Sequence, residues 1–262
     1  MSQGRLFQFG LPVLVGLCVY FLWDAAVLFF EIPEFVLPRP GRIISALFEN
    51  FASLMGSLWV TLRITLLAFA LAVFGGVALA ILFSQSRVIE LALFPYAVIL
   101  QVTPVVAIAP LVLIWVGFDN VNAALLILAW IVAFFPILSN TTLGLRSVDH
   151  NLMDLFTLHG ATRWQRLWSL QLPSALPYIL GGMKISGGLA LIGAVVAEFV
   201  AGSGAGTGLA WRIIEAGNRL QVPTMFAALL LLSALGVAIF FSLTLLEHLA
   251  LRRWHESAVK QG

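Results

Sequence analysis

Few side chains in this sequence could carry out covalent chemistry. The best candidate nucleophile is Ser203, which lies in the glycine-rich segment Gly202–Gly208. A serine hydrolase needs a base within hydrogen-bond reach of that hydroxyl group, and the candidate bases are His248 and His255. Both lie at or beyond the distal end of the last apolar segment, about 30 Å from Ser203 if that segment crosses a membrane completely. An intramembrane serine hydrolase is therefore only an alternative interpretation.

The sequence also lacks the common motifs for binding nucleotides and metals. Its two lysines are Lys184 and Lys260, and neither belongs to a G-x-x-x-x-G-K-[ST] phosphate-binding loop. The segment Gly202–Gly208 does not fit the dinucleotide-binding pattern G-x-G-x-x-G. The four histidines lack zinc-site spacing, and Cys18 is the only cysteine. We expect no cofactor in this chain, so any ATP and magnesium would act on a partner.

The composition is that of an integral membrane protein. Hydrophobic residues make up 61% of the 262 residues, charged residues make up 10%, and the mean hydropathy is +1.04; in soluble domains about a quarter of the residues are charged. A membrane-spanning helix needs about 20 largely apolar residues. Six segments meet this need: Phe9–Phe30, Ser57–Phe83, Val88–Val116, Val121–Leu143, Ala175–Val200 and Met225–Leu251. Continuous apolar runs favour helices over a β-barrel, which predicts a single all-α domain with about six transmembrane helices.

Basic residues predict how these helices cross the membrane, because cytoplasmic loops are enriched in arginine and lysine. With six spans, one side collects both termini and Arg5, Arg87, Arg146, Arg163, Arg166, Arg252, Arg253 and Lys260. The other side has Arg39, Arg42, Arg212 and Arg219. We therefore expect both termini to be cytoplasmic. The net charge of +2 reflects this topological bias and gives no reason to expect nucleic acid as a partner.

Prolines and small residues predict the shape and packing of the spans. Pro95, Pro104 and Pro110 should bend the third segment. Small residues recur at every fourth position of the second and fifth segments: Ala68, Ala72, Gly76, Ala80 and Ser84, and Gly182, Ser186, Ala190 and Ala194. Such stripes let helix backbones approach closely. They could mark packing within one subunit or an interface between two subunits.

The region before the second span should lie at the membrane surface. Glu31–Gly41 contains three prolines and is predicted to be an extended outer loop. Apolar residues then recur at helical spacing in Ile43, Ile44, Leu47, Phe48, Phe51 and Leu54. This pattern predicts an amphipathic helix at the membrane interface. We therefore divide the chain into an N-terminal region at 1–56, a membrane core at 57–251 and a tail at 252–262.

The longest polar stretch is Asn140–Leu172, and it has a helical pattern of its own. Asp149 or Ser147 can cap a first short helix, whose apolar face contains Leu152, Leu155, Phe156 and His159. Gly160 should end that helix. A second helix should then follow.

The second short helix is predicted from its capping residues. Thr162 and Gln165 have the spacing of a capping box, and Pro173 should end the helix before the fifth span. Trp164 and Trp168 would lie on one side of it. A helical pair with exposed tryptophans, tied directly to two spans, is suited to dock in a groove on a soluble protein and pass on its movement.

This polar loop resembles the cytoplasmic coupling loop of ABC importer permeases. That family's pattern is Glu-Ala-Ala, three residues, Gly, nine residues, then Ile-x-Leu-Pro. Asp154 stands at the Glu, Gly160 at the Gly, Leu170 at the Ile and Leu172-Pro173 at the Leu-Pro. The chain departs from the pattern at the two alanines, which are Leu155 and Phe156 here. These bulkier side chains imply a different fit in the partner's groove.

The likeness continues outside the loop, from about residue 35 onward. It includes Leu37-Pro38-Arg39-Pro40, Trp115-Val116-Gly117-Phe118, Gly144–Asp149, Gly160–Trp164 and Ala197-Glu198. These segments are similar to permeases of the sulfonate, taurine and nitrate branch. Asp154–Trp164 and Leu191–Gly202 are also similar to the permeases for pyrimidine thiamine precursors and riboflavin.

The resemblance implies a type I permease subunit without enzymatic activity, in the bacterial inner membrane. Its implied partners are ABC ATPase subunits, which carry the ATP and magnesium, a periplasmic or lipid-anchored solute-binding protein, and a second permease copy. The residues implied in coupling to the ATPase are Asp154, Leu155, Phe156, His159, Gly160, Ala161, Arg163, Trp164, Leu170, Leu172 and Pro173. A stand-alone secondary transporter is a further alternative, but no convincing inverted repeat or deeply buried acid cluster supports it.

Five polar or aromatic residues are candidates for a translocation path or gate. They are Gln101, Trp115, Asn140, Ser186 and Glu198. Glu198 is the strongest candidate, because it ends a stripe of small residues just before the glycine-rich segment. A local structural role, such as accepting hydrogen bonds from loop amides, explains Glu198 equally well. Helix–helix hydrogen bonds would also explain Gln101 and Asn140.

Overall fold

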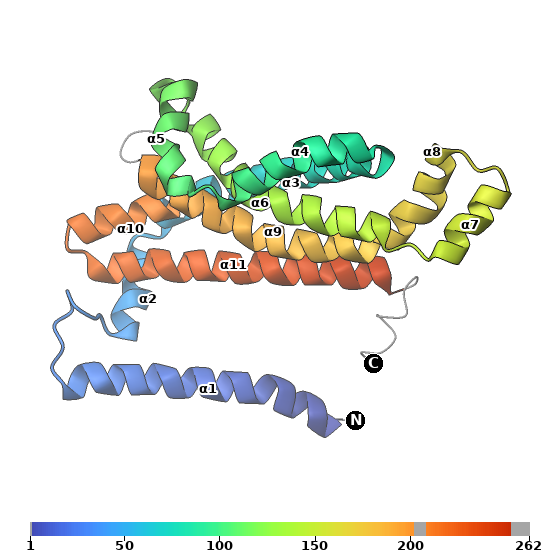
Figure 1. The fold of residues 1–262 in the computed structure, drawn as a ribbon. Helices are drawn as coiled ribbons and strands as arrows, with labels where there is room; N and C mark the ends of the chain where they lie inside the picture. The colour runs from blue at the N-terminus through green and yellow to red at the C-terminus, as the bar shows by residue number, and fades with distance from the viewer. Residues whose placement is uncertain (1, 202–207, 253–262) are drawn as a thin grey trace.

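The computed structural model describes residues 2–201 and 208–252, and in these ranges the protein is a bundle of helices without strands (Figure 1). The α-helices are α1 (Ser2–Phe29), α2 (Pro40–Glu49), α3 (Phe51–Gln85), α4 (Arg87–Val102), α5 (Val105–Val116), α6 (Val121–Arg146), α7 (His150–Leu158), α8 (Arg163–Arg166), α9 (Leu172–Ala201), α10 (Leu209–Asn218) and α11 (Val222–Leu251). Two shorter turns are the 3-10 helix η1 (Phe118–Asn120) and the π-helix η2 (Leu167–Gln171). The predicted all-α fold is confirmed.

The number of candidate spans agrees with the predicted number of about six. Within the described ranges five helical segments are long and apolar enough to cross a membrane, and α4 with α5 form a pair bent by 103° that counts as a sixth if the two cross as one broken span. The bend lies at Thr103 and Pro104, where Thr103 has the extended backbone that a residue before proline prefers. Pro95 and Pro110 lie inside α4 and α5. The helix predicted for the third span is therefore broken at Pro104.

The predicted amphipathic helix is shorter than expected. It ends as α2 at Glu49, so Phe51 and Leu54 belong to α3 instead. The break lies at Asn50, whose backbone amide and side-chain Nδ2 both donate to the Ala46 carbonyl, at 3.1 Å and 3.0 Å. The chain then turns directly into the 35-residue helix α3.

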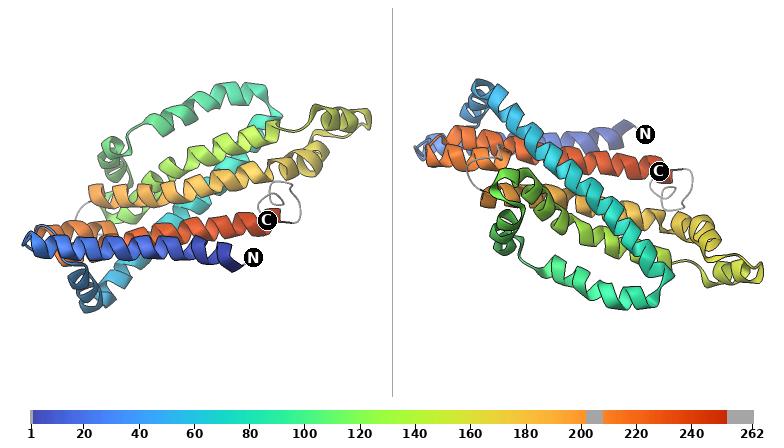
Figure 2. Two further views of the ribbon diagram at one scale, coloured as in Figure 1. Left: turned by 90° about the horizontal axis from the view of Figure 1, so that it is seen from below. Right: turned by 90° about the horizontal axis from the view of Figure 1, so that it is seen from above.

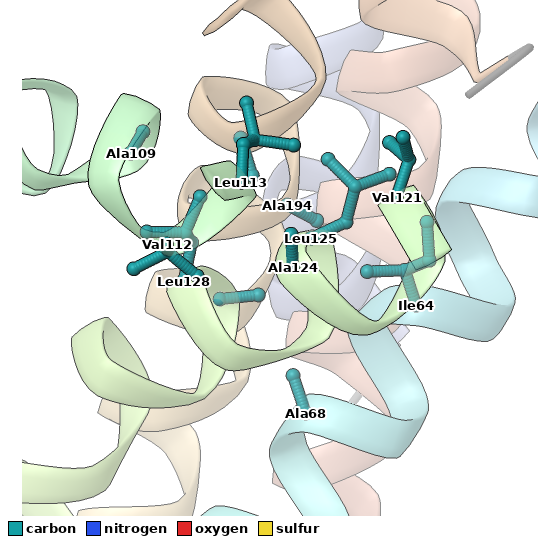
Figure 3. Close-up of a cluster of buried hydrophobic side chains, with 12 residues drawn as sticks. Ile64, Ala68, Ala109, Val112, Leu113, Val121, Ala124, Leu125, Leu128 and Ala194 are labelled. Carbon is teal, nitrogen blue, oxygen red and sulfur yellow. The ribbon is translucent and has the colours of Figure 1, made fainter. Parts of the chain in front are cut away.

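The core is centred on α6, which packs against α3 on one side and α9 on the other. Figure 3 shows one core cluster, in which Ile64 of α3, Leu113 of α5, Leu125 of α6 and Ala194 of α9 meet. A Cβ atom added at Gly193 would lie 2.8 Å from the Ala129 Cα atom of α6. This close approach explains why α9 presents small residues to α6.

The stripe on α3 packs on α6 in the same way. A Cβ atom added at Gly76 would lie 2.7 Å from the Ile137 Cγ2 atom, and Ala68, Ala72 and Ala80 are fully buried. Both stripes therefore serve packing within one chain.

Helix α1 lies beside the bundle and touches it near one end only (Figures 1 and 2). Trp23 packs against Phe226 of α11 with ring centroids 5.9 Å apart. Two hydrogen bonds of 2.9 Å join the Arg39 guanidinium group to the Asp24 carboxylate. These contacts lie at the far end of the bundle, which carries α2 and α10. The opposite end, called here the hairpin end, carries α7 and α8 together with the start of α1 and the end of α11 (Figure 1).

Candidate functional site

The predicted coupling loop folds as a helical hairpin that projects beyond the bundle (Figure 1). Helix α7 begins where the Asp149 carboxylate accepts a hydrogen bond from the Asn151 amide at 2.7 Å, so the predicted cap is confirmed. After α7 the amide of Ala161 donates to the Phe156 carbonyl at 2.9 Å. Gly160 lies in this turn with a φ angle of +68°, which glycine adopts without strain. The turn reverses the chain and starts the second helix.

The predicted capping box of the second helix is confirmed. The Gln165 amide donates to the Thr162 hydroxyl oxygen at 3.3 Å, and the Thr162 amide donates to the Gln165 side-chain oxygen at 2.8 Å. The guanidinium group of Arg166 also reaches the Thr157 hydroxyl group on α7 at 3.5 Å. The hairpin is therefore fixed at its turn and tied between its two helices.

The prediction that Pro173 ends the second helix is wrong. The segment Arg163–Ala201 is one continuous helix that runs from the hairpin into the membrane. Proline lacks an amide hydrogen and clashes with the carbonyl group four residues earlier in a regular α-helix. Here the turn before it is widened, and the Leu172 amide donates to the Leu167 carbonyl, five residues back. The π turn lets the helix continue through Pro173.

An apolar surface, called here the hairpin ridge, is exposed on both helices of the hairpin. It consists of Leu152, Leu155, Leu158, Trp164 and Trp168, whose exposed fractions lie between 46% and 83%. Large apolar side chains exposed in an otherwise polar loop are candidates for contact with another protein. Sequence reasoning missed Leu158, the most exposed of the five, because it does not belong to the face that the helical pattern selected.

The predicted coupling residues divide into an outward and an inward set. The outward set consists of Asp154, Leu155, His159, Gly160, Arg163 and Trp164. Phe156, Ala161, Leu172 and Pro173 are half-buried, and Leu170 is buried. The outward residues are therefore the ones most accessible to a separate protein.

The root of the hairpin contains a buried acidic residue that the sequence analysis did not single out. Glu90, in the first turn of α4, forms ion pairs with Arg87 of the same turn and with Arg146 at the end of α6. The Glu90 side chain is only 9% exposed. Arg146 lies 56 positions from Glu90 in the sequence, so the sequence carried no signal that these two residues meet.

At the far end, Glu198 is buried and holds the start of α10. Its carboxylate accepts a hydrogen bond from the Thr61 hydroxyl group at 2.7 Å and another from the Ala210 amide at 2.9 Å. The Thr61 oxygen in turn accepts from the Leu209 amide at 2.9 Å. The carboxylate and hydroxyl together satisfy free amides at the N-terminus of α10. This is the local structural role that was left open for Glu198.

The other candidate path residues lie in two different environments. Ser186 is buried and its hydroxyl group donates to the Ala133 carbonyl at 2.7 Å. Asn140 is half-buried and its amide donates to the Pro136 carbonyl at 2.8 Å. Gln101 and Trp115 are instead exposed on the two halves of the broken span, Trp115 by 77%. Only these last two face outward from the chain.

The fold and the projecting hairpin define the class of protein: a multi-pass, all-helical membrane subunit with a surface for a separate partner. Residues 72–252 match the family described as binding-protein-dependent transport system inner membrane component. The chain is 36% identical to a riboflavin transport system permease of Chloroflexus aurantiacus over 95% of its own length and 91% of the relative's. It is 32% identical to a formylaminopyrimidine transport permease of Halalkalibacterium halodurans over 94% of its length and 97% of the relative's.

A solved structure agrees with this fold. The crystal structure of an amino acid ABC transporter with histidines superposes with a TM-score of 0.63 at 18% identity, covering 79% of this chain and 96% of the other. The chain belongs to the family of binding-protein-dependent inner membrane components and is a permease subunit of an ABC importer. Such permeases act with ATPase subunits and a solute-binding protein. The secondary-transporter and serine-hydrolase alternatives are thereby set aside, and Ser203 lies outside the described residues.

Proposed function

We propose that two copies of this chain form the membrane pathway of an importer for a small polar solute, and that each hairpin ridge docks in a groove on an ATPase subunit. The ridge is the observation that supports this proposal. Leu158, Trp164 and Trp168 would otherwise hold large apolar side chains in water. Burial of apolar surface contributes roughly 25 cal/mol per Å², so a groove that covers these side chains gains affinity. Residues Arg163 and Arg166 lie beside the ridge and add charge for an acidic groove.

Movement of the ATPases would then reach the membrane through the hairpin. The hairpin connects directly to α6 and α9, the two helices at the centre of the core. Displacing it would rock the two permease copies between inward-open and outward-open states. ATP and magnesium would remain on the ATPase, and this chain would carry the solute without covalent chemistry.

The proposed orientation places the hairpin end in the bacterial cytoplasm, together with both termini. Arg87, Arg146, Arg163, Arg166 and Arg252 lie at this end, as the bias of basic residues toward the cytoplasm requires. The far end, with α10 held by Glu198, would face a periplasmic or lipid-anchored solute-binding protein. The membrane is the inner membrane.

The solute would be small and polar. The relatives are named for riboflavin and formylaminopyrimidine transport, and the sequence also resembles sulfonate, taurine and nitrate permeases. We propose that the solute belongs either to the group of riboflavin and pyrimidine thiamine precursors or to the group of sulfonates, taurine and nitrate. Uptake of labelled solutes by the reconstituted importer, with its binding protein loaded with each solute in turn, separates the two groups.

The first test is assembly. We expect co-expression with the ATPase encoded nearest to this chain to give, in mild detergent, a complex of two permeases and two ATPases by native mass measurement. The double variant Leu158→Asp with Trp164→Ala should lose the ATPase, because it removes an exposed apolar side chain of the ridge from each helix of the hairpin. Trp59→Ala is a matched control, since Trp59 is 65% exposed, like Trp164 at 62%, but lies near the other end of α3. Retention of the ATPase by the double variant would contradict the docking proposal.

A further inference from the structure

The ion-pair cluster at the root of the hairpin joins two elements that the backbone does not connect directly. The Glu90 carboxylate oxygen Oε2 accepts from Arg87 at 2.9 Å and also pairs with Arg146. Arg146 is the last residue of α6, and α7 begins four residues later. Glu90 lies in the first turn of α4, which follows α3 after the single residue Ser86. The cluster therefore ties the start of α4 to the point where the hairpin leaves the bundle.

Side chains of the hairpin and of the bundle also meet around this cluster. A pocket beside Glu90 is lined by Phe83 and Leu145 of the bundle, by Val148 of the connection and by Met153 of α7. Phe83, Leu145 and Val148 are buried. A displacement of α7 therefore acts on the same small region that contains the ion pairs.

Helix α4 has few other attachments. Glu90 and Ala97 are its buried residues, and Phe94 packs against Phe83 and Phe135 with ring centroids 6.3 Å and 6.1 Å away. Figure 2 shows α4 along the outside of the bundle, away from α11. Its other end is the 103° bend to α5 at Pro104. A helix of 16 residues, about 24 Å long, is thus attached by Glu90 at the hairpin end, by Phe94 and Ala97 along its length, and by a bend at the other end.

We propose that Glu90 is the positioning residue that transmits movement of the hairpin to α4. The inference rests on the proposed function of the hairpin as the ATPase dock. When the hairpin moves the end of α6, Arg146 moves Glu90, and α4 swings about the bend at Pro104. Exposed Gln101 lies just before that bend. The ion pair therefore connects ATPase closure to the broken span, in addition to the direct connections through α6 and α9.

The test uses the full complex of permease, ATPase and binding protein in liposomes, with solute uptake and ATP hydrolysis measured together. Glu90→Gln removes the charge but keeps the size of the side chain. We expect the variant complex to assemble and to hydrolyse ATP, while the number of solute molecules imported per ATP falls about fivefold or more. Fivefold is about the lower limit of the change that coupling between two sites typically produces. Exchanging the charges in Glu90→Arg with Arg146→Glu should restore coupling, because Arg87 and the exchanged pair can form the same cluster.

A second ion pair of this chain is the matched control. Lys184 of α9 and Glu247 of α11 lie 2.8 Å apart and are each 28% exposed. Glu247→Gln should leave the solute imported per ATP unchanged. Spin labels at Leu91 of α4 and Ile185 of α9, both exposed, should show an ATP-dependent distance change in the wild-type background that Glu90→Gln abolishes.

The outcomes separate the two proposals. If the wild-type complex does not form or does not import solute, the proposed function fails. If it works and Glu90→Gln keeps normal coupling, or Glu247→Gln uncouples to the same extent, the role of Glu90 is overturned. Should Glu90→Gln fail to assemble, the charge-exchanged variant decides the matter: restored coupling supports the role, and a folded but uncoupled complex refutes it.

Discussion

Gly160 offers a direct test of how the hairpin turn controls docking. Its φ angle is +68°, and a Cβ atom added there meets no atom within 4 Å. A substitution therefore perturbs the backbone preference alone, without a steric clash. Left-handed backbone costs an alanine about 1–2 kcal/mol, which is a factor of roughly 5–30 in an equilibrium constant. Because the ATPase would bind only the hairpin with this turn formed, the apparent Kd should rise by up to the same factor.

The order of the variants is as informative as the magnitude. Asparagine visits the left-handed region more readily than other residues, and a β-branched residue there is a genuine outlier. We expect ATPase affinity to decrease from the wild type and Gly160→Asn to Gly160→Ala and then to Gly160→Val. The assay is titration of fluorescent ATPase onto permease in nanodiscs. The midpoint of thermal unfolding of the permease alone should change little, because the turn projects from the bundle.

Equal affinity of Gly160→Val and Gly160→Asn would refute this reasoning. It would mean either that the turn rearranges without loss in the complex or that docking does not use the hairpin. The Trp164→Ala variant distinguishes these cases, since it removes a ridge side chain and leaves the turn unchanged.

Three further substitutions test other parts of the structure. Gly193→Ala should lower the stability of the fold by about 1–3 kcal/mol through overpacking against the α6 backbone, which a lower thermal midpoint in detergent would show. The control Gly188→Ala, with open space around it, should leave the midpoint unchanged. Equal midpoints for the two variants would contradict the close packing of α9 on α6. Glu198→Ala leaves the Thr61 hydroxyl and the Ala210 amide without their acceptor, which costs about 1–3 kcal/mol of stability for each group. Hydrogen exchange in α10 should therefore accelerate. Unchanged protection would show that α10 is held by other contacts. Thr162→Ala removes the capping hydroxyl at about 1 kcal/mol and should accelerate exchange at Gln165; no change there would count against the capping box.

Local sequence signals predicted the features that depend on neighbouring residues. The spans follow from long apolar runs, and the turn of the hairpin follows from Asp149, Gly160 and the Thr162–Gln165 pair, because caps act within a few residues. The bend at Pro104 was also predictable, because proline disfavours helical backbone at the residue before it. The domain boundaries and the roles of the coupling residues stay predictions.

Features that depend on distant contacts or on backbone relaxation could not be predicted. The widened turn before Pro173 is one solution among several that a helix can adopt at a proline. The pairing of Glu90 with Arg146 requires knowledge of how α4 packs. Helix α10 was missed because it has only ten residues and its start is fixed by a buried carboxylate on another helix.

The continuous helix from Arg163 to Ala201 has a consequence for how the two faces of the membrane communicate. From Trp164 to Glu198 is 34 residues, about 51 Å along the helix axis. This helix displays an exposed indole near its start in the hairpin and reaches, near its other end, the buried carboxylate that fixes α10. Under the proposed orientation an axial displacement at one tip would reach the other without crossing a loop. The widened turn at Leu167–Gln171 and Pro177 are the points along this helix where regular α-helical hydrogen bonding is interrupted.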